Sequence, residues 1–126
     1  HPLRVGALLG SGGRADVRPM VRFGFHLGAA FQIRDDVLNL VGDEAMYGKE
    51  INGDIHEGKR TLILIHLIGH AEGADGAFVR DYLAMERDER TPEVVGRVRA
   101  LMDDYGSIVF ATEYGGFVSR YDHRTR

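Results

Sequence analysis

The segment DVRPMVRFGFHLGAAFQIRDDVLNLV, residues 16–41, carries apolar side chains on nearly every side of the helix that it would form. Such a pattern is typical of a helix buried among other helices, because a surface helix confines its apolar residues to one stripe. Gly42 follows, and glycine is common just beyond a helix end. The sequence therefore predicts a long buried helix over 16–41 within a helical protein.

The rest of the chain also favours helices. Residues 42–60 contain four glycines and little periodicity, which predicts a long loop. Thr61 before the apolar run 62–68, and Thr91-Pro92-Glu93 before an apolar stripe, are typical helix starts. Further helices are expected over 77–87, from Thr91 to Gly106, and from Ser107 or 108 to about 121. This pattern predicts an all-α protein, an antiparallel helical bundle.

Length and composition limit the class of protein. The 126 residues suffice for at most one domain. A net charge of −3 offers no basic surface for nucleic acid, and no apolar run approaches the roughly 18 residues of a membrane span. The chain has no cysteine, which excludes disulfides and thiolate metal sites and fits a reducing compartment. We therefore expect a cytoplasmic protein that is not integral to a membrane.

A narrow polar window interrupts the apolar helix. At about 100° per residue, Gln32, Asp35, Asp36 and Asn39 share an arc of roughly 100°. Two adjacent carboxylates in an apolar setting repel each other and lose hydration, so a cation must offset their charge. Mg²⁺ with oxygen ligands and substrate phosphates is one solution. Solvation at a helix end, or pairing with a basic side chain, is the other, and the pair alone leaves both open.

The loop after this helix carries two lysines, Lys49 and Lys59, each preceded by glycine, with Asp54 between them. Glycine lets the backbone approach a ligand closely, and lysine supplies a point charge for phosphate. Taken alone, the loop is better explained as a solvated connection between helices.

Together the two stretches resemble the second aspartate-rich motif and the following loop of the trans-isoprenyl diphosphate synthases, the farnesyl and geranylgeranyl diphosphate synthase group of the polyprenyl synthetases. The family's pattern is FQ, two residues, DDxxD, a spacer, GK, four residues, D, three residues and GK. The matching positions are Phe31, Gln32, Asp35, Asp36, Gly48, Lys49, Asp54, Gly58 and Lys59.

The resemblance implies an all-α bundle of the isoprenoid-synthase type, usually a homodimer, that condenses isopentenyl diphosphate with an allylic diphosphate by Mg²⁺-assisted ionisation. It implies that Asp35 and Asp36 are Mg²⁺ ligands and that Gln32 and Lys49 contact the allylic diphosphate. Lys59 would close the loop over that diphosphate, Asp54 would shape the loop, and Phe31 would face the isopentenyl unit.

Two departures from the pattern qualify these expectations. The third acid of the motif is Asn39, which predicts only a weak metal ligand. No first aspartate-rich motif is present, since the other Asp pair, Asp103-Asp104, lies at an expected helix end. We therefore expect residues 1–126 to be the C-terminal part of a single polyprenyl synthetase domain, inactive by itself. A non-catalytic subunit or binding module is the alternative; a terpene cyclase is disfavoured because its Asn/Ser/Glu triad is missing.

Overall fold

The computed structural model describes residues 2–42 and 51–124, with side chains described up to residue 118. The described chain is helical and contains no strand, which confirms the all-α prediction. Its elements, in order, are α1 (Pro2–Gly10), α2 (Arg18–Val41), α4 (Gly53–Glu57), α5 (Leu62–His70), α6 (Gly73–Ala84), the 3-10 helix η1 (Arg87–Glu89), α7 (Pro92–Asp104) and α8 (Ser107–Arg124).

The two predicted threonine caps are confirmed. Thr61 Oγ1 accepts a hydrogen bond from Leu64 N at 3.2 Å at the start of α5. Thr91 Oγ1 accepts one from Val94 N at 3.4 Å at the start of α7. Each hydroxyl thereby satisfies an N–H group that has no partner within the helix.

The prediction of a loop throughout 42–60 is wrong for its second half, where α4 forms. Ile55 is 3% exposed and packs into the core, which supplies the tertiary stabilisation that a five-residue helix lacks by itself. Gly58 ends α4 with φ +70 and donates its backbone N–H to Ile55 O at 3.1 Å. This left-handed conformation favours glycine. The sequence analysis also assigned no helix to α1.

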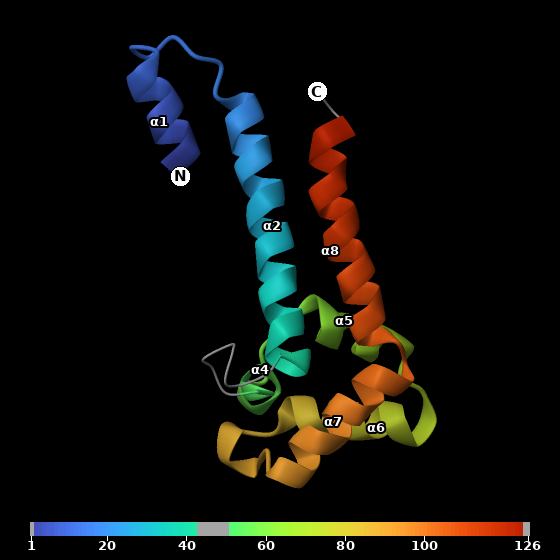
Figure 1. Ribbon diagram of the computed structural model, residues 1–126. Helices are drawn as coiled ribbons and strands as arrows, with labels where there is room; N and C mark the ends of the chain where they lie inside the picture. The colour runs from blue at the N-terminus through green and yellow to red at the C-terminus, as the bar shows by residue number, and fades with distance from the viewer. Residues whose placement is uncertain (1, 43–50, 125–126) are drawn as a thin grey trace.

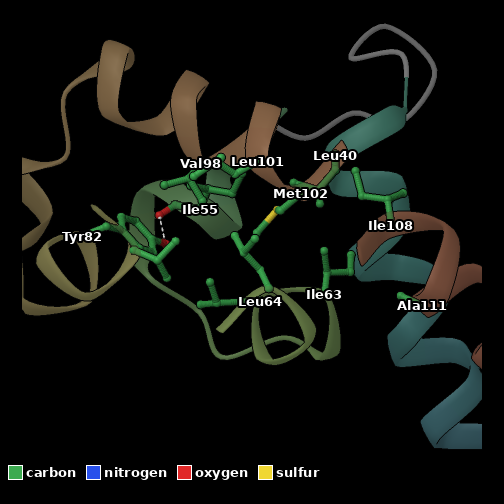
Figure 2. Close-up of a cluster of buried hydrophobic side chains, with 12 residues drawn as sticks. Leu40, Ile55, Ile63, Leu64, Tyr82, Val98, Leu101, Met102, Ile108 and Ala111 are labelled. Carbon is green, nitrogen blue, oxygen red and sulfur yellow. Dashed lines mark hydrogen bonds between the residues drawn. The ribbon is translucent and has the colours of Figure 1, made fainter. Parts of the chain in front are cut away.

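The hydrophobic core lies among α4, α5, α6 and α7 and the adjoining ends of α2 and α8 (Figure 2). Tyr82 of α6 is fully buried there, and its hydroxyl donates to Ile55 O at 2.7 Å. The buried cluster consists of Leu40, Ile55, Ile63, Leu64, Leu67, Val79, Tyr82, Val98, Leu101, Met102, Ile108 and Ala111.

The long helices α2 and α8 run antiparallel, side by side, away from this core, and α1 lies beside α2 (Figure 1). The prediction that 16–41 is buried among other helices is wrong here for most of its length. Phe25 is 71% exposed and Phe31 72%, and only Asp36, Asn39 and Leu40 of α2 are buried. The reason is that, among the described helices, α8 and α1 lie along the first part of α2, while the others gather at its C-terminal end (Figure 1). No described helix is both long and apolar enough to cross a bilayer.

Candidate functional site

The end of α2 brings together residues from both stretches singled out in the sequence. Asp36 is 5% exposed in the penultimate turn of α2. Its Oδ1 accepts hydrogen bonds from Lys59 Nζ at 2.7 Å and from Gln32 Nε2 at 2.9 Å. Because Lys59 lies 23 positions away along the chain, only the fold can create this ion pair.

Asn39, one turn after Asp36, holds the beginning of α4. Its Oδ1 accepts from the backbone N of Asp54 at 3.0 Å, and its carbonyl oxygen accepts from Asn52 N at 2.9 Å. Asn52 has a left-handed φ of 62, an uncommon conformation outside glycine. The side-chain oxygen that the sequence predicts as a weak metal ligand therefore has a structural role in the described chain: it positions the segment that leads to Lys59.

The electrostatics of the cluster keep Lys59 positively charged. The hydrogen bond to Asp36 raises the pKa of Lys59, although burial opposes the shift. Burial raises the pKa of Asp54, and the negative charges of Asp36 and Asp35 raise it further. The positive charge of Lys59, whose Nζ lies 3.8 Å from Asp54 Oδ2, lowers this pKa and so opposes the shift. The Lys59 side chain is 42% exposed, so its ammonium group can also meet a ligand arriving from solvent.

The floor of the cluster is apolar. A cavity of about 10 Å³, room for one water molecule, lies below the Asp36–Lys59 pair. It is lined by Asp36, Leu40, Asp54, Ile55, Lys59, Thr61, Leu64, Tyr82 and Met102. The Lys59 side chain therefore lies between this small cavity and the solvent.

Of the other predicted site residues, Asp35 borders this cluster, Phe31 lies apart from it, and Lys49 is outside the described residues. Phe31 lines a separate groove of about 470 Å³ between α2 and α8, together with Ile33, Arg34 and Ala111. Asp35 adjoins Asp36 and is half-buried. Lys49 lies outside the described residues. The structure thus unites Gln32, Asp36, Asn39, Asp54 and Lys59 and places Phe31 elsewhere on α2.

Sequence reasoning missed Arg90 and Tyr82, which support α4 from below. Arg90 is 9% exposed and donates to the carbonyl oxygens of His56 and Met85. It belongs to the charged run MERDER, residues 85–90, a pattern typical of a solvated segment. The sequence signal that bears on them is Ile55, an apolar residue within the glycine-rich stretch, because an apolar side chain there indicates that other residues pack against it.

The cluster has the right donor chemistry for a hard divalent cation but too few donors by itself. Asp35 and Asp36 provide carboxylate oxygens, the ligands that Mg²⁺ prefers. Lys59 and Gln32 already bind Asp36 Oδ1. No group of three or more His, Cys, Asp or Glu side chains suited to a metal occurs within residues 2–42 and 51–118. Further ligands would therefore have to come from substrate phosphate, water or another segment.

Comparison with known proteins gives a consistent result. The polyprenyl synthetase family model matches residues 1–102. Octaprenyl diphosphate synthase of Haemophilus influenzae is 32% identical over 105 residues, which cover 83% of this chain and 31% of that protein. A short chain isoprenyl diphosphate synthase of Methanothermobacter thermautotrophicus is 32% identical over 120 residues, 95% of this chain and 34% of that protein.

A shorter match is closer in sequence. Geranylgeranyl diphosphate synthase of Sulfolobus acidocaldarius is 49% identical over 61 residues, 48% of this chain and 18% of that protein. The chain spans about a third of the length of the first two relatives. No solved structure matches it at a significant level.

Proposed function

This chain belongs to the polyprenyl synthetase family, and on that premise we propose that the complete protein is a prenyltransferase that condenses isopentenyl diphosphate with an allylic diphosphate. The observation that carries the proposal is the 2.7 Å contact between Lys59 Nζ and Asp36 Oδ1. It joins the two motif segments through the lysine that would bind phosphate and the carboxylate that would bind the metal. The names of the relatives, which are synthases of prenyl diphosphates, support the same reaction class.

The side chains of the cluster would bind and orient the allylic diphosphate. Lys59 would move from Asp36 to a phosphate oxygen, where its charge favours departure of the diphosphate. The amide of Gln32 would donate a hydrogen bond to the same group, and Lys49 would add a second cation. Phe31 and the apolar groove between α2 and α8 would lie on the side of the isopentenyl unit, where an apolar wall excludes water from the allylic cation.

The same residues fit a part of a magnesium site. Once Lys59 has turned to the phosphate, Asp35 and Asp36 would hold Mg²⁺, with Asn39 as a weaker oxygen donor. Bound Mg²⁺ supplies positive charge that stabilises the developing diphosphate anion. Because the sequence lacks a first aspartate-rich motif, we propose that residues 1–126 do not catalyse the reaction alone. We further propose that the complete protein acts as a homodimer, as the resemblance to the family implies.

A binding module or non-catalytic subunit of the same fold is the second candidate. The observation that favours it is the small donor set, since the described residues offer no cluster of three metal-binding side chains. Such a protein would bind diphosphate through Lys59 but would not ionise it.

The test is turnover of the complete protein with isopentenyl diphosphate, allylic diphosphates and Mg²⁺. We expect Asp36→Ala to lower kcat by about 100- to 1000-fold, the usual effect of removing a group that stabilises transition-state charge. Asp104→Ala is the matched control, because Asp104 is an exposed aspartate of the other Asp pair. Turnover near the wild-type value in a folded Asp36→Ala protein would remove Asp36 from the site. Diphosphate binding without turnover in the wild-type protein would favour the binding module.

A further inference from the structure

Arg90 is a buried cation for which the described residues provide no acidic partner. None of the ion pairs formed within the described part of the chain involves it. Its Nη1 donates to His56 O at 3.3 Å and its Nη2 to Met85 O at 2.6 Å. The guanidinium carbon lies 5.2 Å from the centre of the Tyr82 ring. Taking a charge out of water is unfavourable unless hydrogen bonds compensate, and two carbonyl groups do so here, which fixes the guanidinium relative to both segments.

The guanidinium lies directly against the turn that leads to Lys59. A Cβ atom built at Gly58 would come within 2.6 Å of Arg90 Nη2, so the backbone at Gly58 and Arg90 are in close contact. Within α4, the carbonyl oxygen of Ile55 accepts a hydrogen bond from the Tyr82 hydroxyl, and that of the next residue, His56, accepts one from Arg90. Two successive carbonyl groups of α4 are therefore held from below by side chains of the core.

We propose that Arg90, supported by Tyr82, is a positioning residue that sets the diphosphate affinity of the site by fixing the α4 turn, the backbone from which Lys59 reaches both Asp36 and a bound phosphate. The inference rests on the proposed function, since it assumes that Lys59 binds diphosphate. Lys59 follows Gly58 directly, and its long side chain is 42% exposed, so its place depends on the backbone that carries it. A ligand-binding group that is already in place loses less conformational freedom on binding.

Arginine suits this role better than lysine does. Its planar fork lets two nitrogens donate in fixed directions to His56 O and Met85 O while the flat face covers Tyr82. A lysine would keep the charge, but its single ammonium group cannot donate in both of these fixed directions, so Arg90→Lys should not fully restore the geometry.

The experiment is calorimetric titration of the complete protein with inorganic pyrophosphate in the presence of Mg²⁺. We expect Arg90→Met to weaken binding by about three- to tenfold, with Arg90→Lys between it and the wild type, as preorganisation effects of this kind are modest. Arg97→Met is the matched control, because Arg97 also covers an aromatic ring, Phe78 at 4.0 Å, but that ring belongs to α6 and not to the α4 turn. It should leave the affinity unchanged.

A double-mutant cycle separates positioning from general damage. If Arg90 acts through Lys59, Arg90→Met should have almost no effect on pyrophosphate affinity in a Lys59→Ala background, because the two losses are not additive. An equal loss in both backgrounds, or unchanged affinity of a folded Arg90→Met protein, would overturn the inference. If Arg90→Met fails to fold, Tyr82→Phe, which removes only the bond to Ile55 O, takes its place in the same cycle.

The cycle also distinguishes this inference from the proposed function. Lys59→Ala should itself weaken pyrophosphate binding. If it does and Arg90→Met does not, the site stands and only the role of Arg90 is wrong. If Lys59→Ala has wild-type affinity, the assignment of Lys59 fails and the role of Arg90 fails with it.

Discussion

The two ends of the molecule contain similar apolar side chains but bury them very differently. In the core region, residues 51–111 with 36–41 of α2, Leu67 and Tyr82 are fully buried. The hairpin consists of residues 18–35 of α2 and 112–118 of α8. None of its α2 residues is buried, and among its α8 residues Val118 is buried. Figure 1 shows the cause: several helices meet around the core region, whereas two long helices and α1 extend away from it. Apolar content sets how much a helix gains from burial, and the number of neighbours sets how much is buried.

The hairpin nevertheless has a specific packing surface. Gly115 of α8 lies against α2, and a Cβ built there would be 3.1 Å from Ile33 Cγ2. The candidate site lies where the hairpin joins the core region, since Asp36 marks the point at which α2 becomes buried. A site at this junction gains rigidity from the packed core beside it, while the Lys59 side chain remains 42% exposed.

The sharpest test of the comparison is a pair of leucine truncations. Leu67→Ala in the core region should lower the free energy of unfolding by about 2–5 kcal/mol, because it leaves a cavity where packing is complete. Leu27→Ala in the hairpin, where the side chain is 55% exposed, should change it by no more than about 0.5 kcal/mol. Urea unfolding of the 126-residue chain measures both. A loss at Leu27 comparable to that at Leu67 would show that the hairpin is buried in solution, for instance by self-association.

A pair of glycines sharpens the comparison at the level of the backbone. Gly58→Ala should destabilise the chain by about 1–3 kcal/mol, because alanine disfavours a φ of +70 and its Cβ would displace Arg90. Gly28→Ala in the hairpin meets nothing within 4 Å and should stabilise the helix by up to about 1 kcal/mol. Thermal unfolding of both variants measures the two changes in stability, which should have opposite signs. Equal effects would mean that neither the backbone conformation nor Arg90 constrains position 58.

These contrasts also explain which features could be predicted from the sequence. The helix starts at Thr61 and Thr91 depend on residues three positions apart, so local chemistry determines them. The approach of Lys59 to Asp36 followed from a spaced family pattern and not from the residues alone. Arg90 could not be found, because its contact with His56 spans 34 positions and its neighbours in sequence are charged. The exposure of α2 was missed because a sequence pattern shows an apolar surface without showing whether a partner covers it.

The smallest expected effect concerns His66, which links α5 to the first turn of α8 within the core region. His66 Nδ1 and Ser107 Oγ form a hydrogen bond of 2.9 Å between α5 and α8. The His66 ring stacks on His70 at 4.0 Å and on Phe110 at 4.4 Å. Burial lowers the pKa of His66 from 6.5, and the neighbouring charge of His70 lowers it further. The folded chain therefore favours the neutral imidazole.

A base with a lowered pKa in the folded state contributes stability that is present above its unfolded value and lost as the pH falls through the folded pKa. The free energy of unfolding should therefore decline as the pH drops below 6.5, and His66→Gln should flatten this part of the profile. His26→Gln, in the hairpin, controls for the loss of an imidazole and should keep the wild-type slope. Urea unfolding at closely spaced pH values measures the three profiles. If His66→Gln parallels the wild type, protonation of His66 does not couple to folding, and α5 and α8 are held together by their apolar contacts, with Ile63 and Ala111 both buried in the core.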